Sequence, residues 1–179
     1  MVLIVSVVGG WALSRSSDDV DANLTDPGVE QTPGIGTNAN ITGEKFPFVE
    51  VIDVLSGREV TVTPLGKPTV VNFWFSTCEP CKREMPALTA AAGKYGSLVN
   101  FVGINPNDTT ESASAFLDKY GIKYANYLDN GNQLAAAGVT TMPTTFFVDE
   151  RGYIVKTHAG ELTGEDIDSI ITNDLGVRP

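Results

Sequence analysis

Two cysteines separated by two residues are the feature of this sequence best suited to chemistry. Cys78 and Cys81, the only cysteines among 179 residues, enclose Glu79 and Pro80. A β-branched and aromatic run precedes the pair, and apolar residues at helical spacing follow it. We therefore expect Cys78 at a helix start, where unpaired N–H groups and the helix dipole favour a thiolate. Such a pair can exchange a disulfide with another thiol.

The order of the two sulfurs predicts their roles. Cys78 is expected to attack, whereas Cys81, one turn into the helix on its apolar face, resolves the mixed disulfide. Pro80 suits the first turn, where no backbone hydrogen bond is lost. Two alternatives are a structural disulfide, to which so short a loop would contribute about 2 kcal/mol, and half of a metal site shared across a dimer. Two cysteines and one histidine cannot fill a zinc site alone, so we expect neither metal nor other cofactor.

Strand and helix patterns alternate from Phe46 onward and would position this pair. The run 69–75 is nearly continuous in β-branched and aromatic residues, as in a strand buried on both faces. The other expected strands are 48–55 and 59–63, forming a hairpin, then 99–105, 124–128, 144–148 and 153–157. Helical spacing is found in 81–95, 113–120 and 133–137, and after a capping box at Thr163. This order predicts an α/β fold with a central mixed sheet and helices on both faces.

The first 45 residues have a different character. Residues 1–14 are expected to be a signal peptide or partial membrane anchor, because the apolar run is shorter than a bilayer span; a buried first strand is the alternative. Residues 15–45 are rich in acids, proline and glycine, which predicts a disordered linker. It would serve as a tether to a membrane or be simply a tail. The folded domain is then 46–179.

Charge excludes one class of partner. The sequence has 22 acidic and 12 basic residues and a net charge of −10, which repels phosphate backbones. We therefore expect no nucleic-acid partner.

Residues 71–86, with the sequence VNFWFSTCEPCKREMP, extend the argument beyond the cysteines. They resemble the active-site segment of the extracytoplasmic thioredoxin-like proteins of the TlpA/ResA group, which are thiol-disulfide oxidoreductases. Residues 141–144 resemble the cis-proline loop that faces the redox pair in that family. The resemblance covers about 46–175 and implies a thioredoxin fold with an added N-terminal β-hairpin. It also implies an extracytoplasmic, membrane-anchored or secreted protein.

A cis peptide bond at Met142-Pro143 is also expected on physical grounds. Met142-Pro143 lies in a turn that feeds a strand, where cis X-Pro bonds are usually found; a trans turn proline is the alternative. A proline has no N–H, which leaves neighbouring backbone groups open to pair with an extended substrate. The expected substrate-binding residues are Trp74, Glu79, Pro80, Met142, Pro143 and Thr144, although tryptophan at such a position is more often core than contact.

A carboxylate is expected beside the pair. Asn72 stands where thioredoxin has a buried aspartate and cannot take up a proton, so the nearest candidate is Glu84, one turn beyond Cys81. ResA-like proteins carry a glutamate at the matching place, which implies an acid-base role. The alternative is a solvated glutamate beside Lys82 and Arg83.

We therefore expect an exported thiol-disulfide oxidoreductase, monomeric, that acts as a reductant in cytochrome c maturation. Its client would be a protein dithiol or disulfide such as apocytochrome c, and a membrane-bound thiol-reducing protein would supply electrons. The alternatives are an exported oxidase that introduces disulfides and a non-catalytic peptide-binding module. A peroxiredoxin-like peroxidase is a weaker alternative, because neither cysteine has threonine three residues before it.

Overall fold

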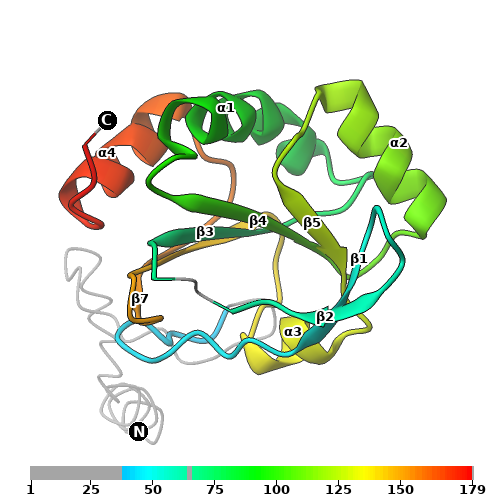
Figure 1. The fold of residues 1–179 in the computed structure, drawn as a ribbon, viewed down its shortest axis with the longest axis horizontal. Helices are drawn as coiled ribbons and strands as arrows, with labels where there is room; N and C mark the ends of the chain where they lie inside the picture. The colour runs from blue at the N-terminus through cyan, green and yellow to red at the C-terminus, as the bar shows by residue number, and fades with distance from the viewer. Residues whose placement is uncertain (1–37, 64–65, 179) are drawn as a thin grey trace, which may run out of the picture. The chain divides into compact units, whose positions relative to one another are not determined.

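The computed structural model describes residues 38–63 and 66–178, so the predicted leader and most of the predicted linker lie outside the described residues. Strands and helices follow the predicted order (Figure 1). The strands are β1 Glu50–Asp53, β2 Glu59–Thr61, β3 Thr69–Phe73, β4 Asn100–Asn105, β5 Ala125–Leu128, β6 Thr144–Val148 and β7 Ile154–Ala159. The helices are α1 Glu79–Tyr95, α2 Thr110–Tyr120, α3 Asn132–Ala136 and α4 Gly164–Asn173. None of the described helices is both long and apolar enough to span a bilayer.

The strands form one mixed sheet in the order β2-β1-β5-β4-β3-β6-β7. β3 pairs in parallel with β4, as does β4 with β5, whereas the remaining pairs are antiparallel. All residues of β3 are buried, as its β-branched and aromatic sequence predicts. The mixed sheet expected from the sequence is therefore confirmed.

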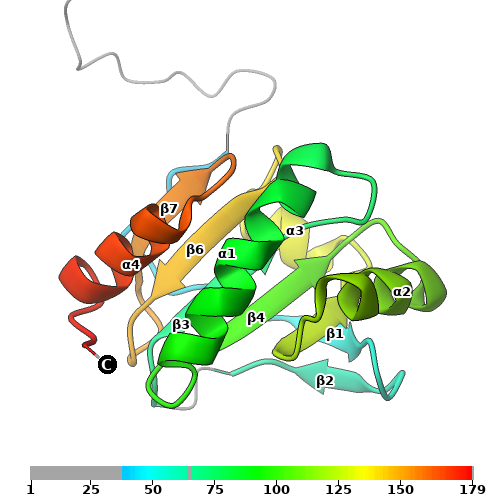
Figure 2. The same ribbon diagram turned by 90° about the horizontal axis from the view of Figure 1, so that it is seen from above.

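Helices cover both faces of this sheet. Figures 1 and 2 show α1, α2 and α4 on one face and α3 on the other. One hydrophobic cluster includes Met85 and Leu88 of α1, and a second includes Phe73 and Phe146. Thr163 and Asp166 form the expected capping box at the start of α4. The layered α/β architecture is thus the predicted one.

Residues 38–45, which the sequence assigned to the linker, are bonded to the domain. Gly43 N–H donates to the carbonyl of Ile154 at 2.8 Å, and Ile154 N–H donates to the carbonyl of Glu44 at 2.9 Å. Phe46 N–H donates to the carbonyl of Gly152 at 2.9 Å. Backbone groups form such bonds whatever the side chains are, so a reading of hydrophobic periodicity cannot predict them. The packed part of the chain therefore includes residues before the expected boundary at Phe46.

Candidate active site

The first turn of α1 places the two cysteines. Cys78 is the N-cap residue with extended backbone angles, φ −77° and ψ 108°, and its Sγ accepts a hydrogen bond from Cys81 N–H at 3.2 Å. Pro80 lies within the first turn, as expected. The Cys78 sulfur therefore lies where the helix directs its unpaired N–H groups, which stabilises a thiolate once the pair is reduced.

The two sulfurs are bonded to each other. Cys78 Sγ and Cys81 Sγ are 2.06 Å apart, and their Cα atoms are 5.2 Å apart. Cys78 is 5% exposed and Cys81 is fully buried. A client can therefore approach the Cys78 sulfur more readily. Within the described part of the chain, no group of three or more His, Cys, Asp or Glu side chains could hold a metal ion.

A carboxylate fixes the turn that leads into Cys78. Asp108 accepts hydrogen bonds from the N–H and the hydroxyl of Ser76, both at 2.7 Å, and from Asn105 Nδ2 at 2.6 Å. Asp108 is not among the residues predicted from the sequence. A signal was present, because β3 and β4 are parallel neighbours and the segments after them emerge at the same end of the sheet.

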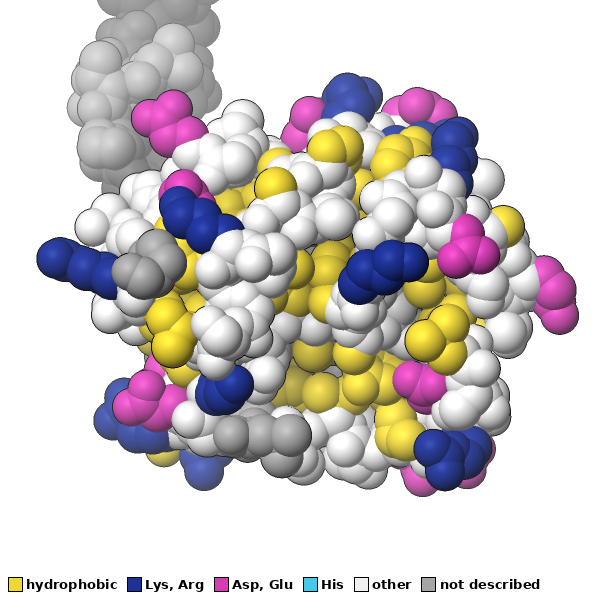
Figure 3. Space-filling model, turned by 45° about the horizontal axis from the view of Figure 1, so that its top comes forward, with side chains coloured by type: hydrophobic (Ala, Val, Ile, Leu, Met, Phe, Trp, Pro, Cys, Tyr) yellow, Lys and Arg dark blue, Asp and Glu magenta, His cyan; other side chains and the backbone are white. Residues whose placement is uncertain are grey.

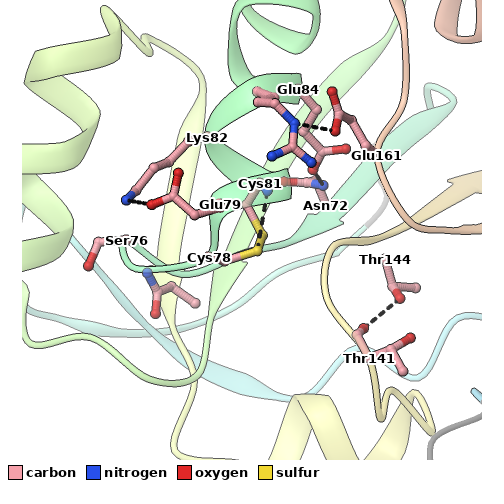
Figure 4. Close-up of a disulfide and its surroundings, with 12 residues drawn as sticks. Asn72, Ser76, Cys78, Glu79, Cys81, Lys82, Glu84, Thr141, Thr144 and Glu161 are labelled. Atoms are coloured by element: carbon pink, nitrogen blue, oxygen red, sulfur yellow. Dashed lines mark hydrogen bonds and ion pairs between the residues drawn. A yellow bond between two sulfur atoms is a disulfide. The ribbon is translucent and has the colours of Figure 1, made fainter.

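Glu84 lies inside the protein. Its Oε1 accepts a hydrogen bond from Asn72 Nδ2 at 2.8 Å, and its Oε2 accepts one from Leu162 N–H at 3.2 Å. Its exposed fraction is 0%, so the alternative of a solvated surface glutamate is wrong. The physical reason is that Cys81 and Glu84, three residues apart, share the face of α1 that packs on the sheet. Figure 4 shows Glu84 and Asn72 together near Cys81.

Burial makes Glu84 a weaker acid than an exposed glutamate. It raises the pKa of Glu84 to about 7, opposed by the hydrogen bonds from Asn72 and the Leu162 N–H and assisted by the charge of Glu161. Burial, together with the charge of Glu84, also raises the pKa of Tyr124 above its ordinary value. A carboxyl group with a pKa near 7 can gain and lose a proton at neutral pH.

Asn72 donates a hydrogen bond to the Glu84 carboxylate, although its own amide cannot take up or release a proton. Its Nδ2 donates to Glu84 and to Thr145 Oγ1 at 2.9 Å. Its Oδ1 is buried and has no hydrogen-bond partner within residues 38–63 and 66–178. Among the described residues, the Asn72 side chain therefore contacts the Glu84 carboxyl group, which can carry a proton, while its own Oδ1 is an acceptor without a donor.

The Met142-Pro143 peptide bond is cis, as predicted. Thr144, the first residue of β6, pairs with Phe73, the last residue of β3, so the proline loop lies at the end of the sheet from which the cysteine turn emerges. The carbonyl of Pro143 accepts a hydrogen bond from Gly160 N–H at 2.8 Å. Figure 4 shows the loop, marked by Thr141 and Thr144, together with the disulfide.

Comparison with known proteins decides the family. A family model described as Redoxin matches residues 41–175. The chain belongs to the Redoxin family. ResA, a thiol-disulfide oxidoreductase of Halalkalibacterium halodurans, is 33% identical over 124 residues, which are 68% of this chain and 70% of that protein. ResA of Bacillus thuringiensis is 30% identical over 132 residues, which are 72% of this chain and 76% of that protein.

A solved structure agrees with these relatives. A thiol:disulfide interchange protein of the thioredoxin family from Chlorobium tepidum is 26% identical, with a TM-score of 0.66 over 78% of this chain and 100% of that chain. The Redoxin-family protein described here is therefore a thioredoxin-like thiol-disulfide oxidoreductase, and its resemblance to the TlpA/ResA group is confirmed.

Three residues expected to bind substrate, Trp74, Pro143 and Thr144, are buried in this Redoxin-family domain. For Trp74 and Thr144, whose side chains bond to the interior, the prediction of substrate contact is wrong. Trp74 is fully buried, stacks on Phe116 with ring centroids 4.6 Å apart, and donates from Nε1 to Asn126 Oδ1 at 3.0 Å. Thr144 is also fully buried, and its hydroxyl donates to the carbonyl of Thr141 at 2.8 Å. Trp74 is a core residue, and Thr144 supports the proline loop from inside.

The outer face of the cysteine turn carries paired charges. Glu79 is exposed and forms an ion pair with Lys82, which holds the pKa of its carboxyl group below the ordinary value. Arg83 Nε pairs with Glu161 at 2.7 Å. Figure 3 shows charges of both signs around exposed apolar side chains on one face. Glu79, Pro80 and Met142 are at least partly exposed, so a client can reach them.

Proposed function

We propose that this thiol-disulfide oxidoreductase reduces protein disulfides outside the cytoplasm and serves cytochrome c maturation. The observation that carries the catalytic part is the Cys78–Cys81 disulfide at the start of α1, where Cys78 Sγ accepts the Cys81 N–H. The link to cytochrome c and the extracytoplasmic location rest on the resemblance of residues 71–86 to ResA-like proteins. A membrane-bound thiol-reducing protein would supply electrons to the monomer.

The reaction consists of two exchanges. The Cys78 thiolate attacks one sulfur of the client disulfide, a Cys78–client bond forms, and the second client sulfur leaves as a thiolate that takes a proton. Cys81 then gives its proton to the Glu84 carboxylate and attacks Cys78 Sγ, which breaks the Cys78–client bond. The first client sulfur leaves as a thiolate and takes up a proton, and Glu84 releases the proton that it took from Cys81, so the carboxylate is restored. The client gains two electrons and two protons, and the protein is left with the Cys78–Cys81 disulfide.

The backbone of Met142 supports client binding at this site. Within the described residues, its N–H and C=O have no hydrogen-bond partner. An extended segment of the client can therefore pair with them, as strands do at a sheet edge.

The direction of electron flow is tested by the reduction potential of the Cys78/Cys81 couple, equilibrated with glutathione buffers. A reductant should have a potential near or below that of thioredoxin, about −270 mV, whereas an oxidase would lie near DsbA, about −120 mV. A value in the oxidising range would overturn the proposed direction.

The roles of the two sulfurs are tested by trapping. Cys81→Ser should accumulate a mixed disulfide with an oxidised peptide that carries the haem-attachment pattern Cys-X-X-Cys-His, because no resolving sulfur remains. Cys78→Ser is the matched control and should trap none. Accumulation with Cys78→Ser but not with Cys81→Ser would reverse the assignment.

A further inference from the structure

One carboxamide outside the predicted domain holds the proline loop. Asn38 Oδ1 accepts hydrogen bonds from the N–H groups of Thr140 at 2.8 Å and Thr141 at 3.1 Å, and from their hydroxyls at 3.2 and 3.3 Å. Asn38 Nδ2 donates to Thr144 Oγ1 at 2.7 Å. A single side chain therefore bonds to residues on both sides of Met142 and Pro143.

The segment that carries Asn38 is itself fixed. Ala39 N–H donates to the carbonyl of Gly138 at 2.9 Å. Gly138 has φ +60°, and a Cβ at this position would lie 2.4 Å from Ala39 Cβ. Glycine is therefore needed both for the backbone conformation and for the close approach of the two segments. Farther along, Gly43 and Glu44 bond to Ile154 of β7, so the segment is held at two points.

These contacts fix the residues on either side of Met142. Thr141 is bonded through its N–H to Asn38 and through its C=O to the Thr144 hydroxyl, and the Pro143 carbonyl is bonded to Gly160. Met142 lies between these anchored neighbours, and within the described residues its own N–H and C=O are unpaired. An anchored loop with free backbone groups is prearranged to bind an extended chain, which lowers the entropy lost on binding.

We infer that Asn38 is a positioning residue that sets the proline loop for binding an extended client segment. The inference rests on the proposed function, because it assigns client binding to the backbone of Met142. Asn38 precedes the residues 41–175 that the Redoxin model matches, so that match does not cover this contact. Asn38 acts through the loop and takes no part in the sulfur chemistry.

The test is single-turnover reduction by the pre-reduced full chain of two disulfides, a disulfide-linked peptide and dithiodipyridine, which has no peptide backbone. Asn38→Ala should raise the half-saturating peptide concentration by about three- to tenfold, the effect of losing roughly one net hydrogen bond. The limiting rate with peptide, the rate with dithiodipyridine and the reduction potential should stay at wild-type values, because the sulfurs are untouched.

Two further variants sharpen the result. Asn40→Ala removes an exposed amide whose Oδ1 bonds to Thr42 N–H in its own turn, and it should behave as wild type. Asn38→Asp keeps an oxygen acceptor for Thr140 and Thr141 and loses the donor to Thr144, so peptide binding should weaken less than in Asn38→Ala.

Several outcomes separate this inference from the proposed function. Wild-type peptide binding in Asn38→Ala would overturn the inference alone, as would an equal loss with dithiodipyridine or a shifted potential. An Asn38→Asp defect as large as that of Asn38→Ala would contradict the role given to Oδ1. A wild-type protein that reduces dithiodipyridine but not the peptide would overturn client reduction itself.

Discussion

Glu84 and the inner cysteine lie on one buried face of α1, and this placement gives the carboxylate a use. With a pKa raised to about 7 by burial, Glu84 is present in both protonation states near neutral pH. The proton that Cys81 must lose then has an acceptor on the same buried helix face that can take it up near neutral pH. Asn72 donates to this carboxylate, and its Oδ1 has no hydrogen-bond partner in the part of the chain that the structure describes, so an amide and not a second acid lies beside Glu84.

Replacing Glu84 with Gln should allow the thiolate to form at lower pH. The amide keeps the shape of the side chain and removes the negative charge of Glu84, which opposes the formation of a negatively charged thiolate on the cysteine pair. The measurement is thiolate absorbance or alkylation rate of the reduced protein from about pH 5 to 10, described by macroscopic values for the coupled groups. The pH dependence of disulfide reduction should change with it.

Glu161→Gln is the matched control for this titration. Glu161 is exposed and paired with Arg83, and its charge is the smallest of the causes that shift the pKa of Glu84, so its removal should move the titration much less than Glu84→Gln does. If Glu84→Gln leaves both the titration and the pH profile where the wild type has them, Glu84 has no acid-base role.

At the scale of elements, close contact between neighbouring strands constrains the sequence of β4. A Cβ at Gly103 would lie 1.8 Å from Asn126 Oδ1 and 2.7 Å from Trp74 Nε1. Gly103→Ala should therefore displace Asn126, break its hydrogen bond with Trp74 and lower the free energy of unfolding by about 2 to 3 kcal/mol. Urea denaturation of the oxidised protein measures the change.

Gly93→Ala is the matched control for Gly103→Ala. Gly93 lies in α1, and beyond its own helical turn no atom is within 4 Å of the place that a Cβ would occupy. Because alanine favours helix over glycine, this variant should be more stable than wild type by about 0.5 to 1 kcal/mol. Equal stability of the two alanine variants would show that the space at Gly103 is not limiting.

The order of the elements could be predicted because each has a hydrophobic period of its own. The ends of the strands could not be predicted, because a strand ends where its partner strand stops pairing with it. The sequence predicts a strand over 48–55, whereas β1 is Glu50–Asp53 and pairs with β2 over three residues. The burial of Glu84 was left open for a similar reason. Its hydrogen-bond donors lie on other elements, one in β3, 12 residues away in sequence, and one in the segment before α4, 78 residues away.

At the scale of the whole molecule, the site is assembled from distant segments. The cysteine turn follows β3, the proline loop precedes β6, and Asn38 precedes the hairpin. The cysteine motif and the proline loop could be predicted because each has a local sequence pattern. The contact of Asn38 with Thr140, 102 residues away, has no such pattern, because it depends on how the chain folds back.

The buried carboxyl group should also make global stability depend on pH. Because the pKa of Glu84 is raised from 4.5 to about 7, the folded state holds more protons than the unfolded state between these values. The contribution of Glu84 to the free energy of unfolding should therefore be highest below about pH 4.5, fall as pH rises to about 7, and stay low above it. The fall should be on the order of 3 kcal/mol.

Comparison of the oxidised wild type with Glu84→Gln isolates this contribution from the other titrating groups. The amide resembles the protonated carboxyl group and does not ionise, so any hydrogen bond it loses adds an offset that is independent of pH. The stability of Glu84→Gln relative to wild type should rise from about pH 5 to 7 and then level off, whereas that of Glu161→Gln should stay nearly flat. A constant difference between Glu84→Gln and wild type across this range would mean that Glu84 ionises in the folded protein as it does in water, and its proposed role in accepting the Cys81 proton would lose its physical basis.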